Sequence, residues 1–462
     1  MGTQPIPKLL LKNSLPLMLS LFTCSLYNVV DSIFVSHLSE GALTALSLAA
    51  PVQSLMSALG CGIAVGLNAA ISKAMGEKNQ KKVREIASAS MVLAILAWML
   101  IVLACLIGMK PYFAWQASGN IQIYNDGIAY LRICMLVSLG QMVQWVFDRF
   151  LIATGRSSLF LVTLSTASVV NLILDPILIF GYLGFPAMGT AGAAWATVIG
   201  QCCGAVMGII VNLKWNPEIP ILFTLRVKGN CIADILRVGV PTAIMQGIVA
   251  CTGIIMNTIL QAFSSTAIAI MGVCHRLQSL ATIPVHGINN ALIPIIAYNY
   301  GAKHRTRINQ SIRCAMIGSF AIMGVVLLLL LCLPAQILQL FDASEYLLAL
   351  GIPAIRLLAV SYFLSVFGLV CGTVFQSLGK GDFTLYLTLL RQVVLPLGLA
   401  LIFRRSGNLS MIWVAFILAE VLSAPFAALL MQRIRRRILL PLDEDTTADT
   451  LTASMTSRTE SE

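Results

Sequence analysis

The chain has 462 residues, of which 58% are hydrophobic and 11% charged, and its mean hydropathy is +0.88. So few polar side chains cannot cover that much apolar surface in water, which excludes a water-soluble globular protein. The formal net charge of +11 could suggest a nucleic-acid partner. Lys and Arg gather in alternate connections and not along one stripe, however, so no nucleic-acid partner is expected.

Long apolar stretches predict an all-α membrane protein with twelve transmembrane helices, each long enough to cross about 30 Å of hydrocarbon. The alternating pattern of a membrane barrel does not occur, and runs such as 325–333 are apolar on every face, so helices are the only option. The first helix is too long for a cleaved signal peptide. In chain order the helices are expected near residues 14–36, 46–72, 87–109, 128–153, 157–182, 188–213, 236–262, 267–297, 310–333, 349–376, 383–403 and 410–432.

The connections between these helices differ strongly in charge. Twenty-two basic residues lie on one side of the expected membrane, whereas the other side has Lys110, Arg404 and Arg405. The positive-inside rule then places both termini in the cytoplasm and the protein in a cell inner (plasma) membrane. The twelve cysteines lie almost all inside apolar spans and are interpreted as buried hydrophobic residues. No cofactor is expected, because no ATP-binding motif or metal-ligand spacing occurs.

The second half of the chain repeats the first. A shift of 225 positions pairs Pro16 with Pro241 and Gly76 with Gly301. Since each half has six helices, the two lobes are expected to form a parallel internal repeat, with a cavity for cargo between them. Further pairs at this shift are Gln53 with Gln278, Gly62 with Gly287 and Lys78 with Lys303, and Gly155 meets Gly379 at a shift of 224.

The repeat predicts four parts of the chain. We expect an N-terminal six-helix lobe over residues 1–213 and a C-terminal six-helix lobe over residues 236–440. The polar, proline-bearing connection at 214–235 is expected to be a cytoplasmic linker. The tail at 441–462, rich in Thr, Ser, Asp and Glu, is expected to be disordered.

Carboxylates inside the apolar spans carry the main functional signal, because each costs roughly 2.5–3.5 kcal/mol on insertion scales. Asp31 lies deep in the first helix, and Asn171 and Asp175 share one face of the fifth because they are four residues apart. Pro176 frees a backbone carbonyl beside Asp175. With Thr197 of the sixth helix, these oxygens would suit Na⁺ or a shared proton. The alternative is a purely structural role in helix packing.

The second half has no counterpart of this site. The shift of 225 places Asp31 on Met256 and Asp175 on Ala400. The coupling site is therefore expected in the first half alone. Candidates for the cargo cavity are Glu420, Met256, Tyr27 and Gln246.

Two other acids have competing interpretations. Glu420 in the last helix is either a cargo-facing acid or the buried partner of Arg391 or Arg356. Asp148 adjoins Arg149 at the cytoplasmic end of the fourth helix, where an interfacial salt bridge accounts for it. No chemistry is assigned to Asp148.

Several motifs occur in a specific order on the duplicated frame: 27–35 (YNVVDSIFV), 171–176 (NLILDP), 192–197 (GAAWAT), 298–303 (YNYGAK) and 391–393 (RQV). Together they resemble the multidrug and toxic compound extrusion (MATE) family, over roughly residues 8–435. The likeness is strongest to its MepA-type bacterial exporters.

The resemblance implies a secondary active antiporter that uses Na⁺ or H⁺ to expel amphipathic, often cationic compounds by alternating access. It implies that Asp31, Asn171 and Asp175 bind the coupling cation, as metal ligands if the ion is Na⁺, with Thr197 nearby. The expected partners are drug-like small molecules and membrane lipid, and the protein is expected to be a monomer and not an enzyme.

Two rival functions remain open at this point. A lipid-linked oligosaccharide flippase of the same broad superfamily would need a cationic groove, for which Arg276, Arg356 and Arg391 are candidates, although Asp31 with Asp175 argues against it. A membrane-embedded enzyme would need a metal cluster or a nucleophile with a base. Four histidines without ligand spacing give it little support.

Overall fold

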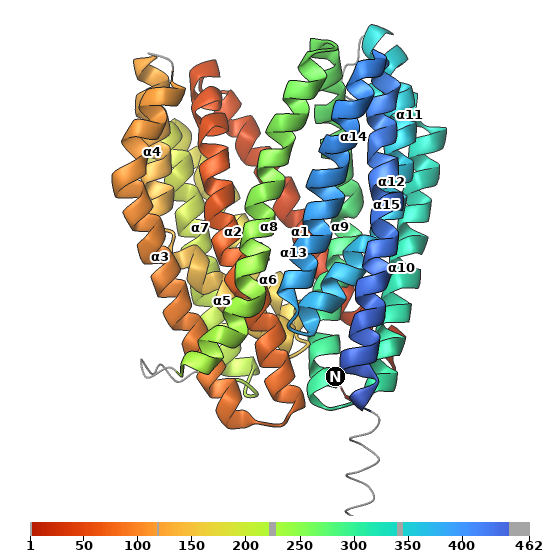
Figure 1. The fold of residues 1–462 in the computed structure, drawn as a ribbon. Coiled ribbons are helices and arrows are strands. Elements are labelled where there is room, and N and C mark those ends of the chain that lie inside the picture. The colour runs from red at the N-terminus through yellow and green to blue at the C-terminus, as the bar shows by residue number, and fades with distance from the viewer. Residues whose placement is uncertain (1, 118–119, 221–227, 340–344, 443–462) are drawn as a thin grey trace, which may run out of the picture. The chain divides into compact units, whose positions relative to one another are not determined.

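The computed structural model describes residues 2–117, 120–220, 228–339 and 345–442, and within them every regular element is helical (Figure 1). The tail from residue 443 and residues 221–227 of the expected linker lie outside the described residues. The main helices are α1 (Ile6–Ser36), α2 (Glu40–Gly76), α3 (Gln80–Gln116), α4 (Ile121–Leu136), α5 (Leu139–Ala153), α6 (Ser157–Phe180), α7 (Thr190–Trp215), α8 (Gly229–Gln261), α9 (Ser265–Gly301), α10 (Arg305–Cys332), α12 (Glu345–Ser377), α13 (Gly381–Leu389), α14 (Leu395–Phe403) and α15 (Leu409–Ile434). The short elements are η1 (Tyr182–Gly184), α11 (Pro334–Gln339), η2 (Leu390–Val394), η3 (Arg404–Ser406) and η4 (Arg435–Leu439).

Eleven described spans are long and apolar enough to cross a membrane, one of them made of α13, η2 and α14 together, and α4 with α5 makes a twelfth, broken span. The single helix expected over 128–153 is therefore two helices, bent by 46°. Ser138 lies at the bend, and its hydroxyl donates to the carbonyl of Met135 at 2.8 Å. The prediction of twelve spans is confirmed with this one interruption.

Contacts divide the chain into two compact units. The boundary passes through α8, most of which belongs with the first-half helices. Unit 1 comprises Met1–Leu11, Ser72–Asn79 and Thr252–Glu462, and unit 2 comprises Lys12–Ile71 and Gln80–Cys251.

The start of α8 is held in unit 2 by ion pairs with α3. The Lys228 Nζ atom lies 2.8 Å from Glu85 Oε1, and Lys82 Nζ lies 3.4 Å from Asp234 Oδ2. The hydrogen bond to Glu85 raises the pKa of the Lys228 ammonium above its usual value. Because all four groups are partly solvated, these pairs position the helix end more than they stabilise the fold.

Equivalent turns in the two halves share one backbone conformation. Lys78 and Lys303, which are 225 residues apart, both adopt the left-handed region, with φ of 54° and 57°. Each backbone N–H bonds back three residues at 3.1 Å, to Met75 and Tyr300. Gly155 and Gly379 form a second matched pair, with φ of 77° and 74°. The parallel repeat is thus present in the structure down to its helix-ending turns.

These turns also meet each other reciprocally within unit 1. A Cβ atom on Gly76 would overlap the carbonyl oxygen of Tyr298, and one on Gly301 would overlap that of Lys73. Tyr298 and Lys73 are themselves 225 residues apart. The Lys73 ammonium also lies over the ring of Tyr300, 5.0 Å from its centroid. Only glycine permits the backbones of α2 and α9 to approach this closely.

Candidate functional site

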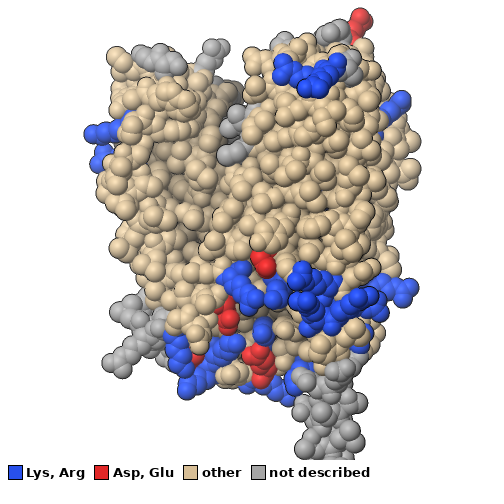
Figure 2. Space-filling model, in the orientation of Figure 1, with Lys and Arg blue, Asp and Glu red and all other residues tan. Residues whose placement is uncertain are grey.

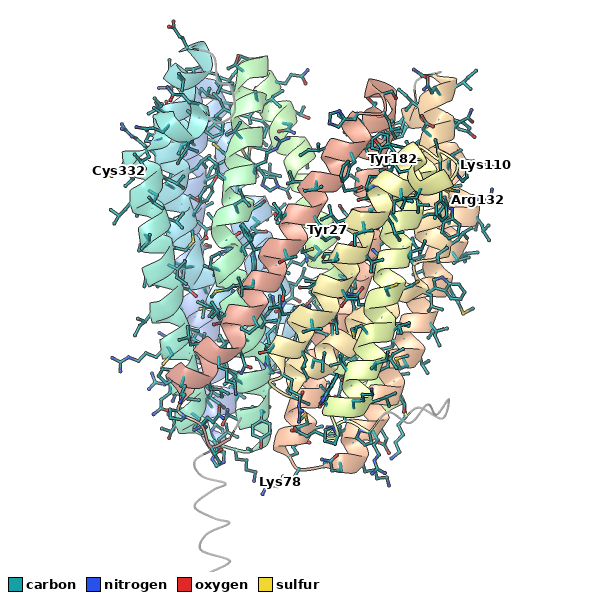
Figure 3. The ribbon with its side chains drawn as sticks, turned by 180° about the vertical axis from the view of Figure 1, so that it is seen from behind. Tyr27, Lys78, Lys110, Arg132, Tyr182 and Cys332 are labelled. Atoms are coloured by element: carbon teal, nitrogen blue, oxygen red, sulfur yellow. The ribbon has the colours of Figure 1, made fainter. Side chains whose placement is uncertain are left out.

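Asp31 lies on α1, the first helix of unit 2. Its Oδ1 atom is buried and has no hydrogen-bond partner. Tyr27, labelled in Figure 3, lies one turn earlier on α1. No hydrogen bond within the structure therefore accounts for the Asp31 Oδ1 atom.

Asn171, Asp175 and Thr197 form a cluster between α6 and α7. Asn171 and Asp175 are 3% and 0% exposed. The Asn171 Nδ2 group donates to Asp175 Oδ1 and to Thr197 Oγ1, both at 3.4 Å. Thr197 donates its own proton to the carbonyl of Ala193 at 2.9 Å. The hydroxyl oxygen thus faces the cluster as an acceptor.

Pro176 sits inside α6 without ending the helix. Proline has no N–H, so the carbonyl of Leu172 lacks its usual helical donor. The helix continues to Phe180 and then stops at Gly181, whose φ is 79°. Beside Asp175 the backbone therefore adds one more oxygen to a region already rich in acceptors.

Three buried oxygens of this region lack partners: Asp31 Oδ1, Asn171 Oδ1 and Asp175 Oδ2. Asp31 and Asp175 are also close enough to repel each other electrostatically. An unsatisfied buried polar atom costs about 1–3 kcal/mol, and more if charged. Several such oxygens in one place fit a hard cation or protons, which would satisfy the lone pairs and cancel the repulsion.

Unit 2 contains a chamber of about 890 Å³ next to this cluster. Five predicted residues line it, namely Asp31, Asn171, Thr197, Tyr27 and Gln246. Asp175 lies behind Asn171 and does not reach the surface of the chamber. No Lys or Arg is among the described residues that form its wall.

Five glutamines are part of this wall, more than any other long polar residue. The sequence predicts only one of these five, Gln246, as a cavity residue. The Gln53 amide donates to the Tyr130 hydroxyl at 3.1 Å, and the Gln246 amide donates to the Cys61 sulfur at 3.7 Å. A neutral amide can donate and accept, so the wall suits ligands of varied polarity. The sequence signal for the other four is the presence of a single glutamine within an otherwise apolar helix. The five are Gln53, Gln141, Gln144, Gln201 and Gln246.

Two expected cavity residues are elsewhere. Met256 is 1% exposed and belongs to unit 1, and it does not line the chamber. Glu420 Oε2 lies 3.6 Å from Arg391 Nη1, and the two side chains are 11% and 4% exposed. Arg391 Nη1 also donates to the carbonyl of Ser365 at 2.8 Å. The structure thus places Glu420 in a buried ion pair, one of the two arrangements expected for it.

The interfacial interpretation of Asp148 is wrong. Its side chain is 2% exposed, and Oδ1 accepts a hydrogen bond of 2.6 Å from Thr163 Oγ1. Position near a helix end suggested solvent, but α6 and α7 pack over this face of α5. Asp148 is thus a buried acid of unit 2.

The family comparison reproduces the internal repeat, because one family model matches each half of the chain separately. The MatE family model matches residues 16–177 and, separately, residues 241–402. Both limits of the second match lie 225 residues after those of the first, which equals the shift that aligns the two halves. The chain belongs to the MatE family. Membership confirms the resemblance drawn from the sequence motifs.

Curated relatives of the MatE family match nearly the whole chain. The multidrug export protein MepA of Staphylococcus aureus (strain MRSA252) is 24% identical over 446 residues, or 95% of this chain and 96% of that protein. MepA of Staphylococcus haemolyticus (strain JCSC1435) is 24% identical over 436 residues, covering 93% and 94%.

The fold is that of a solved MatE-family protein. A multidrug resistance MATE family transporter in an outward-facing conformation superposes with a TM-score of 0.87 at 24% identity, covering 96% of this chain and 97% of that one. These relatives and this structural neighbour are transporters, so a membrane-embedded enzyme is set aside. The protein is a multi-pass membrane protein of a transporter family.

Proposed function

We propose that this MatE-family protein is a secondary active multidrug exporter of the inner membrane. In this proposal an inward gradient of Na⁺ or H⁺ drives the expulsion of amphipathic, often cationic compounds by alternating access. The observation that carries the proposal is the set of three partnerless oxygens, on Asp31, Asn171 and Asp175, beside a chamber of about 890 Å³.

The first step is binding of the coupling ion. With both acids ionised, Asp31 and Asp175 repel each other in a medium of low dielectric. A proton or Na⁺ removes that repulsion, and the Asn171 amide oxygen completes the set of acceptors. The ion thus binds to the carboxylates whose repulsion destabilises the ion-free protein. Its affinity therefore differs between the states of the transport cycle.

The second step couples the ion to cargo. Asp31 belongs to the acidic cluster and also lines the chamber. A cationic compound in the chamber and an ion at the cluster would therefore compete for the same negative charge. Competition of this kind makes antiport, because the arrival of one ligand favours the release of the other.

The chamber wall favours weakly specific recognition. Its aromatic rings, Tyr27, Tyr130 and Trp145, suit flat apolar groups and cations, whereas its glutamines supply donors and acceptors without net charge. The Met256 and Glu420 side chains do not contribute to this wall. We propose drug-like small molecules as the cargo, with lipid as the surrounding partner and a monomer as the working unit.

The charge pattern supports cytoplasmic termini. Within unit 2, Lys110, Arg132 and Tyr182 lie near one end (Figure 3), and most other basic residues of this unit belong to the opposite connections. On the face drawn in Figure 2, Lys and Arg gather around the end of unit 1 where α15 finishes. The exposed residues there include Arg433 and Arg435 to Arg437. The positive-inside rule assigns these ends to the cytoplasm.

A lipid-linked oligosaccharide flippase is the less favoured alternative. Pyrophosphate recognition needs cationic side chains in the binding cavity. The described wall of the chamber has none, and Arg391 is already engaged with Glu420 and Ser365. The polarity of the chamber therefore favours cationic over anionic cargo.

Ethidium uptake into vesicles tests the proposal directly. Inside-out membrane vesicles containing the protein would receive ethidium in the medium, which faces the cytoplasmic side, under a pH gradient or a Na⁺ gradient imposed one at a time with the ion concentrated in the lumen. We expect transport against the ethidium gradient with one of the two ions and none in vesicles that lack the protein. Movement that is equal with and without both gradients would refute a secondary active exporter.

A further inference from the structure

Asp148 is a second buried acid of unit 2, separate from the cluster of Asp31 and Asp175. It lies on α5, five residues before that helix ends at Ala153, or roughly 7.5 Å along the helix axis. Its side chain is 2% exposed. The surrounding part of α5 packs against α3, α6 and α7. A carboxyl group here is costly unless it is hydrogen-bonded or protonated.

Thr163 faces Asp148 with a single hydroxyl that has two acceptors. Its Oγ1 lies 2.6 Å from Asp148 Oδ1 and 2.8 Å from the carbonyl oxygen of Phe160. One hydroxyl proton serves only one acceptor at a time. When Asp148 is ionised, Thr163 donates to the carboxylate. When Asp148 is protonated, its own O–H donates to Thr163, whose proton turns to Phe160.

Hydrogen bonding is therefore complete in both protonation states. Gln144 lies one turn before Asp148 on the same face of α5, and its neutral side chain is also buried. A purely structural acid needs a fixed set of donors, whereas this arrangement accommodates gain and loss of a proton by rotation of one hydroxyl. The geometry thus suits an exchanging proton.

Asp148 lies on α5 between the chamber and one end of unit 2. Gln144 lines the chamber and lies one turn before Asp148 on the same face of α5. Beyond Ala153 the chain turns through Gly155 to Arg156, which pairs with Glu218 at 3.4 Å on the surface. Asp148 therefore lies between the chamber and the end of α5 that the charge pattern assigns to the cytoplasm.

Arg149 is the charged group that acts on Asp148. Among the described residues of α3, α6 and α7, no other titratable side chain does so. The neighbouring polar groups from α6 and α7 are the neutral Thr163 and Asn212, and the latter donates to the carbonyl of Phe147 at 3.0 Å. Burial disfavours the ionised form of Asp148, and the nearby positive charge of Arg149 opposes that effect.

We propose that Asp148 is a proton-carrying carboxyl group that relays protons between the chamber and the cytoplasmic end of α5. In the loading step a hydronium ion in the chamber loses a proton and an O–H bond forms on Asp148. In the release step that O–H bond breaks and the proton passes to cytoplasmic water. This inference rests on the proposed function and assigns H⁺ as the ion that it couples.

Infrared difference spectroscopy tests the proton site without relying on transport. Spectra of the full chain in lipid nanodiscs would be recorded between acid and alkaline pH. We expect a carboxylic-acid C=O band that disappears in Asp148→Asn and shifts in Thr163→Val. The matched control is Thr166→Val on the same helix, because Thr166 is half-buried and its hydroxyl donates to the carbonyl of Val162 at 2.9 Å. Unchanged carboxyl bands in Asp148→Asn would overturn the proposal.

Transport in liposomes then separates the relay from the exporter. Under a pH gradient, Asp148→Asn should slow ethidium efflux roughly tenfold, or about 1.4 kcal/mol in the barrier, while ethidium binding at equilibrium stays within about twofold. Thr163→Val should move the pH profile of efflux, and Thr166→Val should not. Wild-type rates in Asp148→Asn, or efflux driven by Na⁺ alone, overturn the relay. If the wild type moves no dye under either gradient, the proposed function fails and the infrared result still decides whether Asp148 exchanges a proton.

Discussion

Replacing Asp31 by Asn distinguishes a cation site from a packing contact, because the two roles predict opposite changes in stability. Asp31 Oδ1 has no hydrogen-bond partner, and the side chain repels Asp175 when both acids are ionised. A neutral amide of the same size removes this repulsion. If Asp31 served packing alone, the substitution would instead remove a favourable interaction.

The size of the expected change in the free energy of unfolding follows from the charge on the partnerless Asp31 oxygen. Leaving one buried polar atom unsatisfied costs about 1–3 kcal/mol, and the charge on Asp31 adds to that cost. We therefore expect Asp31→Asn to stabilise the ion-free protein by about 1–3 kcal/mol. The gain should be largest at alkaline pH, where both acids would be ionised, and should vanish at acid pH, where protonation already removes the repulsion.

Thermal unfolding in nanodiscs at several pH values, with and without Na⁺, measures this effect. Asp31→Asn should have a higher Tm than the wild type in alkaline, Na⁺-free buffer, and its Tm should respond less to Na⁺ and to acid than that of the wild type. Efflux of ethidium against its gradient should be lost at a normal level of protein in the membrane. Asp126→Asn is the matched control, since Asp126 is a partly exposed acid that accepts from Thr190 at 3.4 Å, and it should change stability by less than about 0.5 kcal/mol.

A lower Tm for Asp31→Asn, together with retained gradient-driven efflux, would show that the acid is a structural hydrogen-bonding group. The cation site of the first half would then have to be abandoned. A lower Tm with lost efflux is resolved by the pH dependence of Tm, which becomes weaker in Asp31→Asn only if the two acids interact as described.

Three further predictions concern topology, the neutral ligand and the second half. Cysteines introduced at Gln80 and Asn309 should resist an impermeant thiol reagent added outside intact cells, and reaction from outside would reverse the assigned orientation. Asn171→Leu should keep the protein folded but abolish the ion dependence of ethidium efflux, because it removes the amide between α6 and α7; unchanged ion dependence takes Asn171 out of the site. Glu420→Gln leaves the buried guanidinium of Arg391 without its counter-charge, so the protein should lose about 3–5 kcal/mol of stability. Adding Arg391→Met should restore part of that loss, and a double variant that unfolds as early as the single one contradicts the pairing.

The buried acids of the two halves differ in their partners. In the first half, Asp31 and Asp175 retain oxygens without partners. In the second half, Glu420 has a built-in cation in Arg391, which sits in the π-helical turn η2. An acid that already has an internal partner has little affinity left for an external ion. This asymmetry explains why an ion-coupling site is expected in one half only.

Several features could be predicted from the sequence because they are local or repetitive. Hydropathy over about twenty residues is enough to locate a spanning helix, and the shift of 225 is a property of the residue order. The pairing of Asn171 with Asp175 follows from helical spacing alone, and the structure has that contact. Asp31 stood out because an acid within an apolar stretch is rare.

Other features depended on which neighbour each helix face meets. A helix that is apolar on all sides gives no hydrophobic stripe to show its buried face. The five glutamines of the chamber therefore could not be placed together from the sequence, and Met256 was assigned to a cavity that it does not line. The break between α4 and α5 lies inside a stretch that hydropathy predicts as one span.

The environment of each acid was decided by tertiary packing. Asp148 lies near a helix end, which suggested an interface, but α6 and α7 cover it and supply Thr163 as its partner. Glu420 had two equally reasonable roles until Arg391 was found beside it. Sequence position gives the approximate depth of an ionisable group along its helix, whereas its solvation and its hydrogen-bond donors come from other helices, distant in the chain, and only the folded structure brings these together.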